Sequence, residues 1–337
     1  MGELMLEDMP QEEAYSELFL TQCYASSGAL SSYAQVSKEL LKSRNAVLLG
    51  ELGAVENPAS LKRGVNPALS TEALAAAASH RPIVLLGGVG AGKSTFIQHL
   101  VAVDAKAVFK DAIAVTVDYG RGATFATPAD FAIERIRYSL REVHGIDIDE
   151  SDFVNDLYRK ELVRFDRSVY GQLKEQAPSD YLLKRVDYLH ELVSNKSEHL
   201  RLSIARISKT RRRQVVIFLD NVDQRDHEDQ NEVFLTANEL ASAWDATVFV
   251  TLRPETYYES QRYGAVSGYH PRVFSISPPR ADVMLRKRVQ FALQILSSNS
   301  DARTSSRIGI ESENLELFLR VLELNFSRNK PLLGLIE

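Results

Sequence analysis

One glycine-rich stretch of the chain has the residue types and spacing of a phosphate-binding loop. Gly87 to Ser94 fit the pattern G-x-x-x-x-G-K-[ST]. Glycines let backbone N–H groups turn towards phosphate oxygens, and a following helix directs its positive end at them. We predict that this loop holds the phosphates of a nucleoside triphosphate, with Lys93 on the β- and γ-phosphates and Ser94 on Mg²⁺. The residues of the loop are Gly87, Gly88, Val89, Gly90, Ala91, Gly92, Lys93, Ser94 and Thr95.

A carboxylate follows an apolar run further along the chain. Asp220 ends the run Val215–Leu219, within VVIFLDNVDQ. An acid at the end of a buried strand is costly unless it has a partner or a function. Together with the loop, it predicts a residue that orders the shell of Mg²⁺; the alternative is a cap for the next helix. Asp118, after the run Ala112–Val117, is a weaker candidate that could be only a turn residue.

Five short apolar runs predict the sheet that must position these residues. They are continuous rather than alternating, which suits strands buried on both faces of a parallel sheet. The segments between them can supply the crossover helices that parallel pairing needs. We therefore predict an α/β fold with a five-stranded, mostly parallel sheet flanked by helices. The runs are Ile83–Leu86, Ala112–Val117, Val215–Leu219, Thr247–Thr251 and Val273–Ile276.

A large helical insertion is predicted at about 124–210, between the second and third runs. Thr127, Pro128 and Asp130 form a helix start, and this helix extends to about Val143. A longer helix is predicted after Pro178. It either packs on its own domain, which we prefer, or forms a projecting arm that pairs with a partner chain. Its apolar residues at helical spacing are Leu182, Val186, Leu189, Val193, Leu200, Ile204 and Ile207.

The two ends of the chain are also predicted to be mainly helical. Helices are expected at Glu12–Ala25 and Ser31–Lys42, with irregular structure over Asn45–Asn66 and a short alanine-rich helix after Ser70. Two further helices are expected near 280–296 and 314–324. The predicted domains are 1–69, an N-terminal helical region and linker; 70–279, the core with its insertion; and 280–337, a helical lid that looks partial. We therefore expect that the chain is a fragment of a longer protein, or that a partner chain supplies the rest of the lid.

Composition restricts the class of protein. The chain has 337 residues, a formal net charge of -5, 45% hydrophobic and 25% charged residues, as in ordinary soluble globular proteins. The lone Cys23 has no disulfide partner, which favours a reducing, cytoplasmic location. No apolar run is long enough for a membrane span, no signal peptide is recognised, and no histidine spacing suggests zinc. The mildly acidic net charge argues against a protein that binds nucleic acid over its whole surface.

From about Arg81 to Arg288 the chain resembles P-loop ATPases of the additional-strand class. More narrowly, it resembles the STAND and origin-recognition-type AAA+ branches. The resemblance rests, in decreasing specificity, on GGVGAGKST, FLDNVDQ, FVTLRPE and SPPRADVMLRKR. It implies ATP and Mg²⁺ as cofactors, with Ser94 and Asp220 at the metal. It also implies that the fourth strand lies between the strand before the loop and the strand that ends at Asp220.

The resemblance implies further catalytic roles. Thr251 would be a polar sensor of the γ-phosphate or the attacking water, and Arg253 would sense the γ-phosphate unless it is a surface salt-bridge residue. Many AAA+ ATPases have Glu after the Asp220 position, but this chain has Asn221, which can orient water without taking its proton. Asp223 is then the expected acid, and hydrolysis is expected to be slow. Lid arginines Arg280, Arg286 and Arg288 would approach nucleotide or, as we prefer, face solvent.

The leading functional interpretation is an ATP-hydrolysing switch that controls assembly or signalling. We expect a homo-oligomer and a separate effector or partner protein. A role in bacterial anti-phage defence is suggested only by analogy with this architecture. ATP is preferred to GTP because no N-K-x-D motif occurs. One alternative is a non-hydrolysing ATP-bound scaffold. Another is a DNA-acting AAA+ ATPase, a loader or transposition regulator, for which a basic segment would contact phosphates; its cations are Arg201, Arg206, Lys209, Arg211, Arg212 and Arg213.

Overall fold

The computed structural model divides the chain into two compact units. Unit 1 comprises Met1–Lys38, Gly87–Ala107 and Ser275–Glu337, and unit 2 comprises Glu39–Leu86 and Val108–Phe274. The residues that the structure describes are 13–49, 81–120, 127–244, 246–263, 271–298, 314, 316–321 and 323. The predicted linker after residue 49, the helix after Ser70 and the boundary at 69/70 lie outside the described residues.

In the described part of the chain, five strands form a parallel sheet in the order β2-β3-β4-β1-β5. Each predicted apolar run became one strand, with ends that moved by one residue at most. β4 lies between β1 and β3, so the predicted place of the fourth strand is confirmed. The strands are β1 (Ile83–Leu86), β2 (Ile113–Asp118), β3 (Val215–Asp220), β4 (Ala246–Leu252) and β5 (Arg272–Ser275).

Helices of unit 2 cover one face of the sheet. They are α7 (Pro128–Glu142), α12 (Lys196–Arg211) and α13 (His227–Ala243), and their apolar residues join alternate residues of the strands in one buried cluster. Residues two apart in a strand point to the same face. The intervening residues therefore face the other way, where Phe218 stacks on Phe249 with ring centroids 5.1 Å apart. Phe109, the last residue of α6 (Lys106–Phe109), packs on Phe218.

The predicted start of α7 is confirmed. Thr127 caps the helix, because its hydroxyl oxygen accepts a hydrogen bond of 3.1 Å from the backbone N–H of Asp130. Pro128 occupies the first helical position, where a missing N–H costs nothing. Ile136 and Leu140, one turn apart, are fully buried against the sheet. The insertion is therefore attached to the sheet by an amphipathic helix.

The single long helix predicted after Pro178 is wrong. The chain forms α11 (Pro178–Ser194) and α12, which are separated at Asn195, whose side chain accepts a hydrogen bond of 3.3 Å from the N–H of Glu198. Leu200 of α12 is fully buried, whereas Leu182 and Val186 of α11 are 56% and 63% exposed. The preferred interpretation is that these apolar residues pack on their own domain. It is confirmed for Leu200 of α12 and wrong for Leu182 and Val186 of α11.

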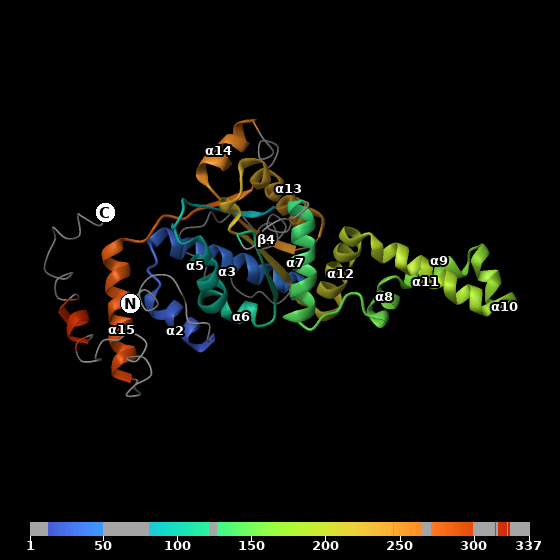
Figure 1. Ribbon diagram of the computed structural model, residues 1–337, viewed down its shortest axis with the longest axis horizontal. Coiled ribbons are helices and arrows are strands. Elements are labelled where there is room, and N and C mark those ends of the chain that lie inside the picture. The colour runs from blue at the N-terminus through green and yellow to red at the C-terminus, as the bar shows by residue number, and fades with distance from the viewer. Residues whose placement is uncertain are drawn as a thin grey trace. The chain divides into compact units, whose positions relative to one another are not determined.

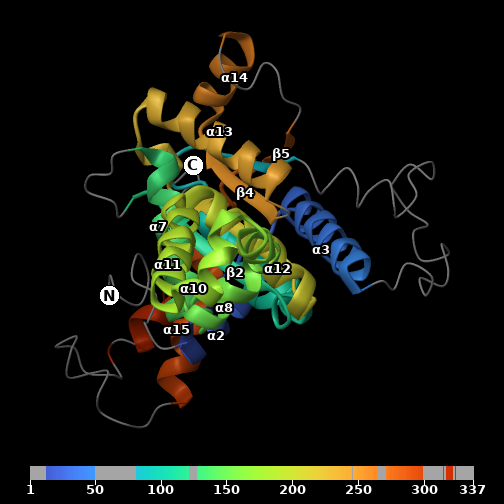
Figure 2. The same cartoon turned by 90° about the vertical axis from the view of Figure 1, so that its right-hand side faces the viewer.

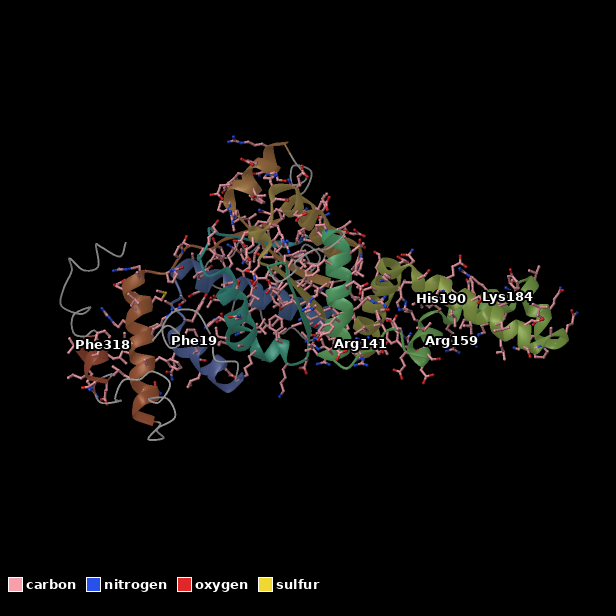
Figure 3. The ribbon with its side chains drawn as sticks, viewed as in Figure 1. Phe19, Arg141, Arg159, Lys184, His190 and Phe318 are labelled. Carbon is pink, nitrogen blue, oxygen red and sulfur yellow. The ribbon has the colours of Figure 1, made fainter. Side chains whose placement is uncertain are left out.

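The middle part of the insertion is a helical arm that projects from the rest of unit 2 (Figure 1) and is seen end-on in Figure 2. An aromatic cluster is its internal core: the ring of Phe165 lies 5.3, 6.0 and 5.2 Å from those of Tyr170, Tyr181 and Tyr188. Lys184 and His190 of α11 are exposed (Figure 3). The arm consists of α8 (Ser151–Leu157), α9 (Arg159–Asp166), η3 (Val169–Gln172), α10 (Leu173–Gln176) and α11.

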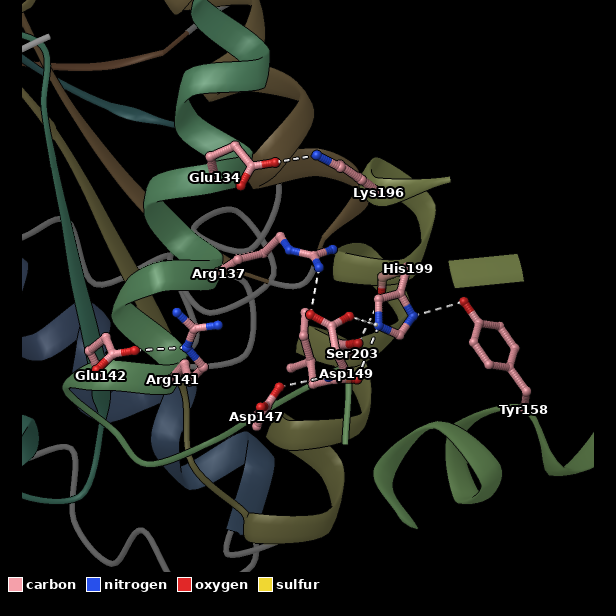
Figure 4. Close-up of polar contacts among 11 residues, drawn as sticks. Glu134, Arg137, Arg141, Glu142, Asp147, Asp149, Tyr158, Lys196, His199 and Ser203 are labelled. Carbon is pink, nitrogen blue, oxygen red and sulfur yellow. Dashed lines mark hydrogen bonds and ion pairs between the residues drawn. The ribbon is translucent and has the colours of Figure 1, made fainter. Parts of the chain in front are cut away.

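Polar contacts join the arm and the segment before it to α7 and α12, and join these two helices to each other (Figure 4). His199 of α12 contacts the hydroxyl of Tyr158, the residue between α8 and α9. Arg137 of α7 donates a hydrogen bond of 2.6 Å to Asp149, in the segment before α8. Lys196, at the start of α12, pairs with Glu134 of α7. The arm is therefore attached through specific hydrogen bonds as well as through the chain.

Unit 1 is helical in its described part. Phe19 of α2 (Glu13–Cys23) packs edge-on against Phe291 of α15 (Ala281–Ser298), with ring centroids 5.8 Å apart. The ring of Tyr24 stacks on that of His99, which ends α5 (Lys93–His99). Burial raises the pKa of the Cys23 thiol to about 11, so the thiol stays protonated at neutral pH. α5 continues directly into the π-helical turn η2 (Leu100–Asp104).

Three helices complete the description. α3 (Gly28–Leu49) belongs to both units, and its Arg44 donates a hydrogen bond of 2.8 Å to Thr247 within unit 2. The prediction of irregular structure from Asn45 is thus wrong for residues 45–49, which are helical. α14 (Pro254–Tyr263) follows β4, and residues 316–321 are helical within the predicted 314–324 segment. None of the described helices combines the length and apolar character needed to cross a bilayer.

Candidate functional site

The glycine-rich loop follows β1 in the chain and precedes α5. Gly90 and Gly92 have φ angles of 73° and 90°, a region that side chains other than glycine rarely adopt. At Gly87 a Cβ atom would lie 2.9 Å from the carbonyl oxygen of Ile276. At Gly88, Gly90 and Gly92 it would meet no atom of the described residues within 4 Å. The glycines therefore serve backbone conformation and close approach, and they leave open space beside the loop.

Lys93 bends back over its own loop. Its Nζ donates hydrogen bonds of 2.7 Å to the carbonyl oxygen of Gly87 and 2.9 Å to that of Gly88. The side chain is buried, while Ser94 and Thr95 in the first turn of α5 are half-buried and Val89 is exposed. The ammonium group is thus held at the loop by acceptors that an anionic oxygen can replace.

The strand register places three predicted residues in one row at the carboxyl edge of the sheet. Asp118 of β2 lies opposite Asp220 of β3. Thr251 of β4 comes one residue after the pair Leu219–Val250 and lies opposite Leu85 of β1. By the alternation of strand residues, this row faces away from α7, α12 and α13. The carboxyl edge is where open parallel sheets bind ligands.

A hydrogen-bonded turn surrounds Asp220. Its Oδ1 accepts a hydrogen bond of 2.9 Å from the N–H of Asn221. Asn221 has a φ of 56°, and its side-chain Nδ2 donates a hydrogen bond of 2.7 Å to Oδ1 of Asp118. The N–H of Gly120 donates to the same oxygen at 3.0 Å. Sequence reasoning missed the Asp118–Asn221 contact, because residues 103 apart meet only through the strand register.

The remaining predicted residues occupy different environments. Asp223 is 7% exposed within the short helix η4 (Val222–Gln224). Thr251 is fully buried, and its Oγ1 lies 3.5 Å from the carbonyl oxygen of Leu219. Arg253 follows β4 directly, and its Nε is buried without a hydrogen-bond partner among the described residues. A buried guanidinium N–H is costly to leave unpaired, so Arg253 is suited to an anionic partner.

The basic segment divides into paired and exposed cations. Arg201 donates two hydrogen bonds, of 2.7 and 2.6 Å, to Glu198 and thereby lowers the pKa of that carboxyl. Arg206 pairs with Asp156, and Arg213 donates to the carbonyl oxygen of Asp111 at 2.9 Å. The exposed cations at the end of α12 are Lys209, Arg211 and Arg212. Half of the proposed nucleic-acid segment thus serves contacts within the protein.

The predicted lid arginines lie in or beside α15. Arg280 pairs with Asp282, Arg286 is exposed, and the guanidinium of Arg288 lies 5.8 Å from the ring centroid of Phe19. These contacts lie within unit 1. They agree with structural or solvent-facing roles for the three cations.

A separate hollow of about 180 Å³ lies beside the C-terminal half of α7. Arg137 and Asp149 are among its lining residues (Figure 4), and none of the predicted site residues is. In the described part of the chain, no group of three or more His, Cys, Asp or Glu side chains is placed to hold a metal ion. The hydroxyl of Ser94 and the carboxylate of Asp220 are nevertheless oxygen donors of the type that Mg²⁺ prefers.

Comparisons of the chain with protein-family models, with curated proteins and with solved structures find no match.

Proposed function

We propose that this chain binds ATP with Mg²⁺ and hydrolyses it slowly, as a switch that controls assembly or signalling. One observation carries the proposal: the strand that leads into the glycine-rich loop belongs to the same parallel sheet as the strand that ends at Asp220, with β4 between them. The order of these strands is the one that the proposal requires, because the strand before the loop and the strand that ends at Asp220 are separated by β4 alone.

The residues of the site fit this chemistry. Lys93 would exchange the carbonyl oxygens of Gly87 and Gly88 for phosphate oxygens, because hydrogen bonds to an anion are stronger than those to a neutral acceptor. Ser94 and Asp220 would hold Mg²⁺, Asp220 directly or through water. When bound, the ion would neutralise phosphate charge. Thr251 and Arg253 would respond to the γ-phosphate, so the states with ATP and ADP would differ in energy.

Assembly and partners belong to the same proposal. A nucleotide can shift assembly only if it binds one assembly state more tightly than the other. The exposed apolar residues of α11 are compatible with a homo-oligomer or with a separate effector protein. Anti-phage defence and the DNA-acting alternative stay hypotheses about the setting in which such a switch would work.

The test measures phosphate release and particle size on the same samples with Mg-ATP, Mg-ADP and a non-hydrolysable ATP analogue. We expect slow release by the wild-type protein, loss of release and of ATP-dependent assembly in Lys93→Ala, and loss of release in Asp220→Ala. Lys110→Ala removes an exposed lysine and should behave as the wild type. ATP binding and assembly without release would favour the scaffold alternative, and absence of ATP binding would contradict the proposal.

A further inference from the structure

Residue 221 directly follows Asp220, the proposed metal ligand, and it is an amide. Asn221 can donate or accept a hydrogen bond, but it cannot take a proton from water at neutral pH. Its side chain reaches across to β2 and donates to Asp118. The fold therefore places the carboxylate of Asp118 beside Asn221, which has no carboxylate of its own.

Several features hold Asp118 in this place. Its Oδ1 accepts 2.7 and 3.0 Å hydrogen bonds from the Nδ2 of Asn221 and the N–H of Gly120. Asn221 reaches Asp118 from a left-handed backbone conformation that asparagine tolerates better than most residues. At Gly120 a Cβ atom would lie 2.7 Å from Oε1 of Gln224 and 3.2 Å from Cβ of Asn221. The glycine thus allows the turn after β2 to approach the turn after β3.

We propose that Asp118 is the general base of the hydrolysis and that Asn221 is its positioning residue; this inference rests on the proposed ATPase function. As the water oxygen bonds to the γ-phosphorus, the carboxylate of Asp118 takes one proton from that water. The bond between the γ-phosphorus and the β–γ bridging oxygen breaks, and its electron pair leaves with ADP. The proton of Asp118 then passes to solvent, which restores the carboxylate.

The surroundings favour Asp118 over Asp223 in this role. Asp118 is partly exposed and lies opposite Asp220 in the row that continues to Thr251. Asp223 is 7% exposed and lies in η4, beyond the ends of the strands. A general base must reach a water molecule, and the more exposed carboxylate beside Asp220 meets that need better.

The test compares Asp118→Asn, Asp223→Asn and Asn221→Gly with the wild-type full chain. Asp118→Asn keeps the shape of the side chain and the acceptor for Asn221 but removes the base. Asn221→Gly keeps the left-handed backbone and removes only the amide side chain. Glu191→Gln, which neutralises an exposed carboxylate on α11, is the matched control. Phosphate release, Mg-ATP affinity and the thermal unfolding midpoint are measured for each.

In Asp118→Asn we expect kcat to fall by about 100-fold or more, with Mg-ATP affinity within about 3-fold of the wild type, since a general base contributes about 100- to 10,000-fold. In Asn221→Gly, kcat should fall by about 10-fold at unchanged KM, because the variant loses orientation and not binding. Asp223→Asn should keep more activity than Asp118→Asn, and Glu191→Gln should match the wild type.

Two results would overturn the role of Asp118 and leave the proposed function standing. The first is an Asp118→Asn protein that releases phosphate within 3-fold of the wild-type rate. The second is a loss of activity in Asp118→Asn that follows a fall in Mg-ATP affinity or in unfolding midpoint. If the wild-type protein binds Mg-ATP but releases no phosphate, or does not bind it, the proposed ATPase and the role of Asp118 both fail.

Discussion

The hydroxyl of Tyr158 lies 3.0 Å from Nδ1 of His199, and this contact connects the arm to α12, which covers the sheet (Figure 4). On its other side, Nε2 of His199 lies 3.1 Å from the carbonyl oxygen of Ile148 and 3.4 Å from Oδ1 of Asp149. Both of these are acceptors, so in the neutral ring Nε2 carries the proton and Nδ1 accepts from Tyr158. Burial lowers the pKa of His199 and raises that of Tyr158 to about 12, which favours this neutral arrangement.

Tyr158→Phe should destabilise the protein by about 1–3 kcal/mol, because Nδ1 of the buried His199 loses its donor. Urea unfolding followed by circular dichroism measures the difference in unfolding free energy. Tyr138→Phe is the matched control, since Tyr138 is half-exposed on α7 and should change stability by less than about 0.5 kcal/mol. Equal effects of the two substitutions would contradict a structural role for the Tyr158 hydroxyl.

Acid should weaken the fold through His199. In the folded protein the pKa of His199 is below that of an unfolded chain, which is about 6.5, so the unfolded state binds more protons in acid. The stabilising contribution is complete above about pH 6.5 and is lost as the pH falls towards the folded pKa. Unfolding free energies measured between pH 8 and 5 should decrease, and His199→Gln should flatten that decrease. His190→Gln, which changes an exposed histidine of α11, should leave it unchanged.

Leu200→Ala and Leu182→Ala should differ sharply in stability although the two leucines belong to one predicted pattern. Leu200 is fully buried, so its truncation leaves a cavity and should cost about 2–5 kcal/mol. Leu182 is mostly exposed, and its truncation should cost less than about 1 kcal/mol. Chemical denaturation of the two variants gives the comparison. Similar large losses would mean that the exposed face of α11 is covered in solution, for example by another copy of the chain.

Gly171→Ala should disrupt the tip of the arm. A methyl group at this position would overlap the backbone carbonyl oxygen of Asp166, and a backbone oxygen cannot move aside as a side chain can. We expect a loss of about 1–3 kcal/mol in local stability, seen as faster amide hydrogen exchange in α9 and α11. At Gly28, the first residue of α3, an added Cβ would meet none of the residues that the structure describes within 4 Å. Gly28→Ala should therefore leave exchange in the arm unchanged, and a similar effect of both variants would refute the steric explanation.

Several features could be predicted from the sequence because they depend on local chemistry. Continuous apolar runs are buried on both faces wherever a parallel sheet forms, so all five strands were found within a residue. Thr127 and Pro128 start α7 because a side-chain acceptor and a fixed φ act within one turn. The glycines of the loop permit backbone angles that other residues strain to adopt, and Gly90 and Gly92 have those angles. The order of the strands, by contrast, came from the resemblance and not from the residues themselves.

Other features were decided by the tertiary structure, because they depend on what each side chain meets. Periodicity shows that a helix has an apolar face but not what covers it, and so Leu182 and Leu200 have opposite environments. Charge shows that Arg206 needs an anion, but only the fold brings it to Asp156 instead of leaving it in solvent. Asp118 and Asn221 meet because β2 and β3 pair in one register, and a shift of one residue would separate them. The sequence by itself thus determined the strands and the glycine-rich loop, while long-range register and burial decided which polar groups stand together at the sheet edge.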